Sequence, residues 1–172
     1  MRLFNSKIPI IARDIVRQLT AAGDIEVNNH EEAELDIQSV LKEYLRMERE
    51  ITDQAKDLME RRKLSHGQFG KIKRQIADQK DLPLGEEGIT FMCNQILETF
   101  MQSNFVEEIF AGDAQMRRSM KELMRRHMLV DEELDAEVRQ RIKNLTEGST
   151  DWDVEYSRAM DQVKRNRGLT GE

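Results

Sequence analysis

The sequence predicts an all-α fold, arranged as an elongated helical bundle. Charged residues make up 35% of the 172 residues and aromatic residues only 5%, which suits helices with wide solvated faces better than a β-sheet. Apolar residues recur at helical spacing along most of the chain. Breaks that contain Gly or Pro separate these periodic segments, and none of the segments is predicted to be a strand.

In the first half, the spacing predicts a short helix, a long helix and a short helix. The short helix covers residues 8–19 and stops before Gly23. The long helix covers residues 30–63, because its acidic start and basic end both complement the helix dipole. Such a helix would be about 50 Å long, so we expect it to pack against something equally long. A third helix is predicted over residues 67–79.

The second half repeats this plan. The pattern predicts helices over residues 89–100, about 114–145 and about 151–166. We therefore divide the chain into two tandem three-helix repeats, at residues 1–85 and 86–172. The two long helices are expected to pack together.

A comparison of the sequence with itself supports this repeat. Shifted by 83 residues, Phe69 falls on Trp152 and Gly85 falls on Gly168. Near the start, a shift of 81 fits better and places Ile25-Glu26 on Val106-Glu107. A two-residue insertion before the second long helix reconciles the two shifts.

Trp152 is the only tryptophan, and the sequence places it where the chain turns back from the second long helix. Ser149 or Thr150 can cap the new helix, and aspartates favour its first turn. We interpret Trp152 and Phe69 as structural anchors, each buried against the end of a long helix, Trp152 near Ile142 and Leu145. The alternative is a ligand-stacking role.

Three segments carry a resemblance to a known family: "LKEYLRMEREI" at residues 41–51, "LDAEVRQRIKNL" at 134–145 and "EGSTDWDVEYSRAMDQVKRNRGL" at 147–169. They resemble a bacterial family of domains of unknown function, number five hundred and seven in that series. The opening matches in the first repeat and the Trp-Asp box in the second, so the chain looks like a double-length member. Phe69 and Gly70 replace the Trp-Asp pair in the first repeat. The resemblance implies an all-helical bacterial cytoplasmic protein and supplies no functional residues.

The charge distribution argues against a dedicated nucleic-acid groove. Residues 1–85 carry 15 Lys and Arg against 15 Asp and Glu, and residues 86–172 carry 12 against 18, which gives the net charge of −6. Neither half is basic overall. The single Cys93 cannot form an internal disulfide, and neither a secretory signal nor a membrane-spanning stretch is recognisable. We expect a soluble cytoplasmic protein that does not associate with a membrane.

No catalytic, metal-binding or cofactor-binding residue is predicted, and no cofactor is expected. The three histidines lack the spacing of metal ligands. His127 is interpreted as a helix-interface residue and Cys93 as a core residue. The acidic cluster at Glu132, Glu133 and Asp135 is interpreted as a solvated face, although an enzyme using such acidic residues is the weakest of three candidate functions.

Two features of the second long helix suggest binding. A methionine ladder repeats every four residues, at Met116, Met120, Met124 and Met128. Methionine suits irregular partners, although a core role is the preferred interpretation. Beside the ladder lie the arginine doublets, whose residues are Arg117, Arg118, Arg125 and Arg126. The favoured function is a non-enzymatic interaction or scaffold protein that binds a protein partner or itself. The alternative is a nucleic-acid-associated protein that uses the arginine doublets.

Overall fold

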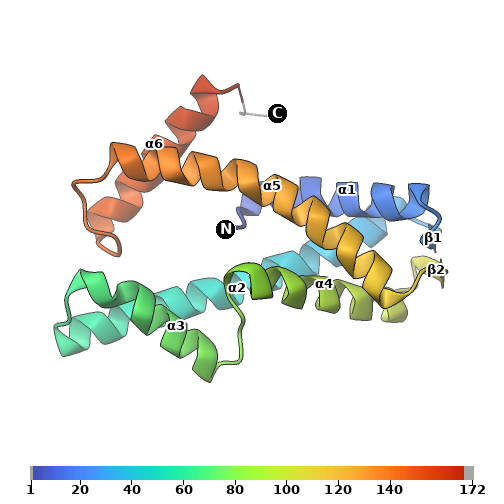
Figure 1. Ribbon diagram of the computed structural model, residues 1–172, viewed down its shortest axis with the longest axis horizontal. Coiled ribbons are helices and arrows are strands. Elements are labelled where there is room, and N and C mark those ends of the chain that lie inside the picture. Colours follow the sequence, from blue (N-terminus) through green and yellow to red (C-terminus); the bar gives the residue numbers. More distant parts are fainter. Residues whose placement is uncertain (1, 169–172) are drawn as a thin grey trace.

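The computed structural model describes residues 2–168, except for the side chains of residues 130 and 131. Its elements in chain order are η1 (Asn5–Lys7), α1 (Ile8–Ala21), β1 (Ile25–Val27), α2 (His30–Arg62), η2 (His66–Gln68), α3 (Phe69–Gln79), α4 (Gly85–Gln102), β2 (Val106–Ile109), α5 (Asp113–Arg141) and α6 (Thr150–Asn166). The predicted all-α fold class is confirmed. Helix, strand, long helix and short helix follow one another in each half of the described chain (Figure 1).

The helix ends follow the local signals of the sequence. The Asn29 side chain accepts a hydrogen bond from the Glu32 N–H and caps α2. This helix stops at Lys63, which adopts a left-handed conformation. The Ser149 side chain accepts from the Trp152 N–H and caps α6, as predicted. Capping side chains satisfy backbone donors that a helix leaves unpaired at its start.

The expectation of no strands is wrong at two short segments. β1 and β2 pair antiparallel, with Ile25 opposite Ile109 and Val27 opposite Val106. The two segments that the 81-residue shift aligns therefore both form strands. They are three and four residues long, which is too short for a reliable periodic signal. Their stability depends on a partner that is remote in sequence.

Four helices form the central bundle next to this small sheet. The main interfaces join α1 with α2, α2 with α4, α4 with α5, and α5 with α1. These four interfaces close a ring, in which α2 and α5 lie diagonally opposite. The prediction that the two long helices pack together is therefore wrong within the described residues. Within the bundle each long helix packs on α1 and α4, and farther from the sheet α2 packs on α3 and α5 packs on α6.

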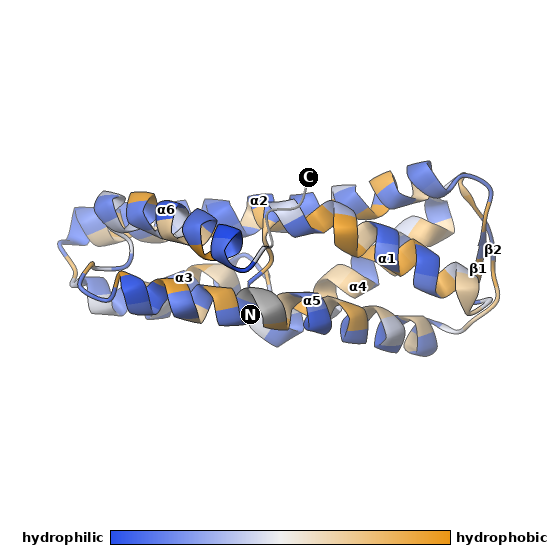
Figure 2. Cartoon of the chain, turned by 90° about the horizontal axis from the view of Figure 1, so that it is seen from above, coloured by the Kyte–Doolittle hydropathy of each residue, from blue (hydrophilic) through white to orange (hydrophobic). Residues whose placement is uncertain are grey.

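Away from the sheet, α2 and α5 continue into two arms (Figure 1). We call α2 with α3 the lower arm and α5 with α6 the upper arm, after their places in this view. Apolar and polar residues alternate around each helix of both arms (Figure 2). The bundle and lower arm share one apolar cluster. A separate cluster fills the upper arm and consists of Leu134, Val138, Ile142, Trp152, Tyr156, Met160 and Val163.

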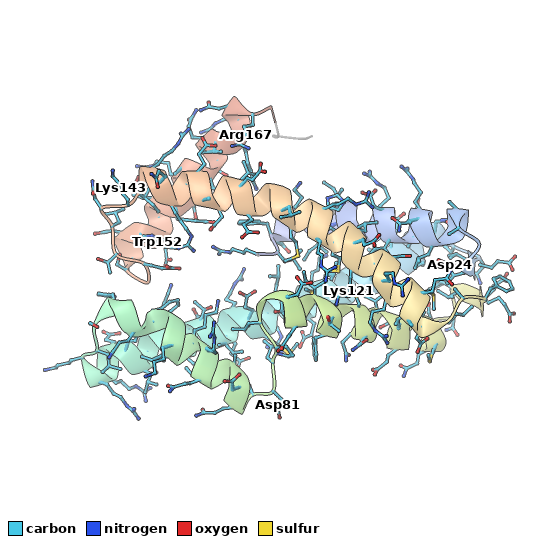
Figure 3. The ribbon with its side chains drawn as sticks, viewed as in Figure 1. Asp24, Asp81, Lys121, Lys143, Trp152 and Arg167 are labelled. Atoms are coloured by element: carbon cyan, nitrogen blue, oxygen red, sulfur yellow. The ribbon has the colours of Figure 1, made fainter. Side chains whose placement is uncertain are left out.

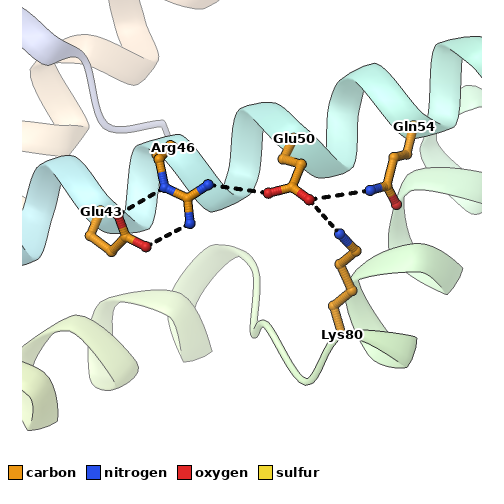
Figure 4. Close-up of polar contacts among 5 residues, drawn as sticks. All are labelled: Glu43, Arg46, Glu50, Gln54 and Lys80. Carbon is orange, nitrogen blue, oxygen red and sulfur yellow. Dashed lines mark hydrogen bonds and ion pairs between the residues drawn. The ribbon is translucent and has the colours of Figure 1, made fainter.

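Charged side chains fix the short helix of each arm to its long helix. In the lower arm, Lys80 donates to Glu50 at 2.8 Å, and Glu50 also accepts from Arg46 at 3.3 Å (Figure 4). The Lys80 hydrogen bond lowers the pKa of Glu50. In the upper arm, Arg167 donates to Glu137 at 2.7 Å and lowers its pKa. Trp152 lies near the start of α6 and Arg167 lies at its end (Figure 3).

Candidate functional site

A cleft of about 700 Å³ lies between the two arms. Its lining combines residues 2–5 with side chains from both arms. The lower arm contributes Leu45, Glu48, Arg49, Thr52, Asp53, Lys56, Phe69 and Lys73. The upper arm contributes Glu132, Asp135, Arg139, Glu147, Gly148, Trp152 and Asp153. The cleft thus brings together segments that are up to about 150 residues apart in sequence.

Trp152 forms the aromatic part of the upper wall. Its ring stacks on the Tyr156 ring, with centroids 4.8 Å apart and planes 23° apart. Trp152 is 8% exposed and belongs to the same apolar cluster as Ile142, with Leu145 packed against that cluster. The predicted surroundings of Trp152 are therefore confirmed. Most of the side chain is enclosed in the arm, although Trp152 also lines the cleft.

Arg139 links Trp152 to the acidic residues of the same wall. Its guanidinium lies 5.3 Å from the centroid of the Trp152 ring, within the range of a cation–π contact. It donates to Asp135 at 2.7 Å and to both carboxylate oxygens of Glu147, at 2.9 and 3.1 Å. The Glu147 hydrogen bond raises the pKa of Arg139. Arg139 is thus a charged centre held in one geometry by three neighbours.

Asp135 also accepts a hydrogen bond from the Tyr156 hydroxyl. Burial raises the pKa of Tyr156, and this hydrogen bond to the carboxylate raises it further. The interpretation of the acidic cluster as a solvated face is wrong for Asp135, whose side chain is 19% exposed. Glu132 and Glu133 are exposed. Their neighbour Asp135 differs because α6 packs over it.

The N-terminal segment closes one side of the cleft. Arg2 lies over two rings, 5.1 Å from the Tyr156 centroid and 5.3 Å from the Phe4 centroid. Phe4 packs against the apolar cluster of the upper arm, and Lys164 of α6 also lies over its ring, at 5.3 Å. The start of the chain is therefore attached to its last helix.

An ion pair connects the arms across the cleft, and Phe69 and Gly148 lie near each other at the arm tips. Lys56 of α2 donates to Asp153 of α6 at 2.7 Å. At the tips of the arms, a Cβ added to Gly148 would lie 3.8 Å from the Phe69 ring, an ordinary van der Waals distance. The prediction that Phe69 is buried like Trp152 is wrong, because Phe69 is half-buried and lines the cleft. Phe69 packs against the apolar cluster of the bundle and lower arm, and its ring also lies near Gly148 of the opposite arm.

The methionine ladder lies in the central core. Met116, Met120, Met124 and Met128 are 0–3% exposed, so these positions do not form an exposed binding face. The Met124 sulfur lies 3.8 Å from the sulfur of Cys93, which is also fully buried. Burial raises the pKa of the Cys93 thiol to about 12.

The arginine doublets are divided between two faces of α5. Arg117 donates to Asn94 at 2.6 Å and Arg125 pairs with Glu86, so both contact α4. Arg118 and Arg126 are exposed. None of these four residues lines the cleft. His127 lies at the interface with α1, where its Nε2 is 3.0 Å from a carboxylate oxygen of Asp14.

The sequence analysis missed most of the cleft. Asp135 and Arg139 are four residues apart, a spacing that predicts an ion pair on one helix face. This contact could have been predicted from the sequence. The pairing of Lys56 with Asp153 spans 97 residues and leaves no local signal. Within the part of the chain that the structure describes, no group of three His, Cys, Asp or Glu side chains could hold a metal ion. None of the described helices combines the length and apolar character that a membrane crossing requires.

Comparisons with known proteins give a family and no activity. No curated protein matches the chain. A single family model covers almost all of it, including both arms and the central bundle. That model, described as "Protein of unknown function (DUF507)", matches residues 1–169, so the chain belongs to this family.

Proposed function

We propose that this protein is a non-enzymatic interaction protein that holds a segment of a partner protein in the cleft between its arms. The observation that carries the proposal is the cleft itself, whose volume of about 700 Å³ lies between two walls built by different helices. A volume of this size is typical of ligand sites, which span about 300–1,000 Å³. It suits a few side chains of a partner segment.

The mixed charge of the lining favours a protein partner over a polyanion. The basic residues are Arg2, Arg49, Lys56, Lys73 and Arg139, and the acidic residues are Glu48, Asp53, Glu132, Asp135, Glu147 and Asp153. Five cations and six carboxylates form a surface that would repel a run of phosphates as much as attract it. A protein segment can present both signs and also contact the rings of Phe4, Phe69 and Trp152. Charge complementarity of this kind gives binding specificity.

The alternative function, nucleic-acid association through the arginine doublets, has weaker support. Arg117 and Arg125 already bind partners on α4. This leaves Arg118 and Arg126 as the exposed members. Two cations contribute little of the salt-dependent affinity that six to ten phosphate contacts provide.

A photocrosslinking experiment tests the cleft directly. A benzophenone amino acid replaces Asp53, which is exposed and lines the cleft. The matched control carries it at Gln54, the next residue, which is exposed and bonds Glu50 outside the cleft. In bacterial lysate treated with nuclease, the proposal expects defined protein adducts from position 53 and not from position 54. Equal adducts at both positions, or adducts that disappear after nuclease treatment, would contradict it.

The proposal also includes the tandem arrangement with boundaries at residues 1–85 and 86–172, and a bacterial cytoplasmic setting. The repeated order of helix, strand, long helix and short helix supports a duplication. So does the pairing of β1 with β2, which brings equivalent segments of the two halves together. Expression of residues 1–85 and 86–172 as separate chains tests it. Two halves that assemble into a heterodimer with helical content close to that of the whole chain are the expected result.

A further inference from the structure

A second recess lies between α1 and α5, on a part of the molecule distinct from the cleft. It is a groove of about 480 Å³ lined by Asp14, Arg17, Gln18, Ala21, Leu123, Arg126 and His127. No residue lines both this groove and the cleft. The interaction function proposed above makes no use of it.

The one carboxylate in the lining of the groove, that of Asp14, contacts two neighbouring side chains. One oxygen of Asp14 lies 3.0 Å from Nε2 of His127, and the other lies 3.7 Å from Nε of Arg13. Asp14 therefore has a nitrogen partner for each oxygen.

The two guanidinium groups of the groove differ from Asp14 in this respect. Among the side chains that the structure describes, Arg17 and Arg126 form no ion pair with a carboxylate. Arg126 donates only to the neutral Gln18 side chain, at a long 3.4 Å. Both arginines are exposed, on two helices that face each other across the groove. The groove thus presents two guanidinium groups that can both bind an anion.

We propose that this groove binds the phosphoryl group of a small phosphorylated molecule through Arg17 and Arg126. A planar guanidinium offers paired N–H donors that match the oxygens of a phosphate. The apolar side chains of Ala21 and Leu123 supply a floor for the remainder of the ligand.

The length of the groove favours a small ligand over a nucleic-acid strand. On α1 the lining runs from Asp14 to Ala21, which is about 12 Å of helix at 1.5 Å per residue. This distance accommodates one or two phosphoryl groups. Asp14 lines one end of the groove, and its carboxylate would repel a phosphate chain that continued in that direction.

Titration with inorganic pyrophosphate tests the proposal. Amide chemical shifts of the full chain are followed by NMR, with sodium chloride adjusted so that ionic strength stays constant. The wild type is expected to show saturable shifts at residues of the groove such as Gln18 and His127. Arg17→Gln and Arg126→Gln should each weaken binding about ten-fold or more, because each removes a charged hydrogen-bond donor. Glutamine is a good helix former, so the helices should remain.

The matched control is Arg118→Gln, which removes the same charge from an exposed position of α5 outside the groove. It should bind pyrophosphate like the wild type. Absence of saturable shifts overturns the proposal, and so does equal weakening in all three variants, which would indicate general charge attraction. A single-stranded oligonucleotide forms a separate arm. If it binds more tightly than pyrophosphate and loses affinity in Arg118→Gln as well, the small-ligand assignment is wrong and nucleic acid replaces it.

Discussion

Lys56 of α2 and Asp153 of α6 form an ion pair of 2.7 Å that joins the two arms across the candidate site. Their side chains are 30% and 47% exposed. Exposed ion pairs typically contribute less than about 1 kcal/mol to folding. The pair is therefore more important for the position of the arms than for the stability of the fold.

Lys56→Gln should widen the distribution of distances between the arms while the melting temperature changes little. Spin labels at Ser65→Cys and Asn144→Cys report this distance, because both positions are exposed near the arm tips. The buried Cys93 should stay unlabelled. The exchanged pair Lys56→Asp with Asp153→Lys serves as the control and should restore the narrower distribution. An unchanged distribution in Lys56→Gln would show that the ion pair does not set the distance between the arms.

Trp152→Ala should destabilise the protein by about 3–5 kcal/mol, the range for deletion of a large buried ring. Since Trp152 belongs to the cluster of the upper arm, the loss should be local. Hydrogen exchange is expected to accelerate in α6 and the C-terminal part of α5 more than in α1. Trp152→Phe, which keeps an aromatic ring, should have a smaller effect. Unchanged melting combined with loss of crosslinked partners would instead identify Trp152 as a recognition residue.

Gly88 is required by the close approach of Tyr44. A Cβ at position 88 would lie 2.2 Å from the Tyr44 hydroxyl and 3.0 Å from the carbonyl oxygen of Pro83, to which that hydroxyl donates. Gly88→Ala should therefore destabilise by about 1–3 kcal/mol through overpacking. Gly70→Ala is the matched control, because a Cβ there meets no atom within 4 Å. It should be neutral or slightly stabilising in a helix.

The double variant Tyr44→Phe with Gly88→Ala tests this explanation further. Removing the hydroxyl removes the closest atom, so the cost of Gly88→Ala should fall when Phe occupies position 44. Chemical denaturation of the four proteins gives the coupling free energy. Additive effects would show that the Tyr44 hydroxyl is not the obstacle, and the Pro83 carbonyl would then be the cause.

The helices follow from local patterns, and this explains which predictions succeed. The predicted cap at Ser149 needs only neighbouring residues, and the apolar stripes need only helical periodicity. The ring of four helix interfaces depends instead on which stripe covers which, and the sequence of one helix does not specify its partner. The cleft arises because α2 and α5 diverge beyond the bundle. The contact between Lys56 and Asp153 in this cleft joins distant parts of the chain, so no local sequence pattern predicts it.

Stability should fall at alkaline pH because of Cys93. Burial raises the pKa of this thiol from 9.0 to about 12 in the folded protein. Between these values the unfolded chain releases a proton that the folded chain keeps. The unfolded state then binds fewer protons, so the free energy of unfolding decreases as pH rises from about 9 to 12. The raised pKa values of Tyr44 and Tyr156 act in the same direction.

Denaturation measured at several pH values checks this slope. Cys93→Ala should be less stable than the wild type at neutral pH, but its stability should decrease less steeply above pH 9. A thiol reagent at pH 8 should react with Cys93 only after denaturant is added, since the folded thiol is buried and protonated. Rapid labelling of the native protein would contradict the assigned environment.

The division of the arginine doublets between two faces predicts opposite outcomes for two double variants of equal charge. Arg117→Gln with Arg125→Gln removes the side chains that bind Asn94 and Glu86. It should lower the melting temperature, because α5 loses polar contacts with α4. Arg118→Gln with Arg126→Gln changes two exposed side chains and should leave melting nearly unchanged, as surface substitutions usually do. Neither variant should alter nucleic-acid binding, which we expect to be weak at physiological salt. Submicromolar binding under those conditions, lost only when Arg118 and Arg126 are replaced, would show that the exposed face contacts phosphates and would favour the nucleic-acid function over the interaction function.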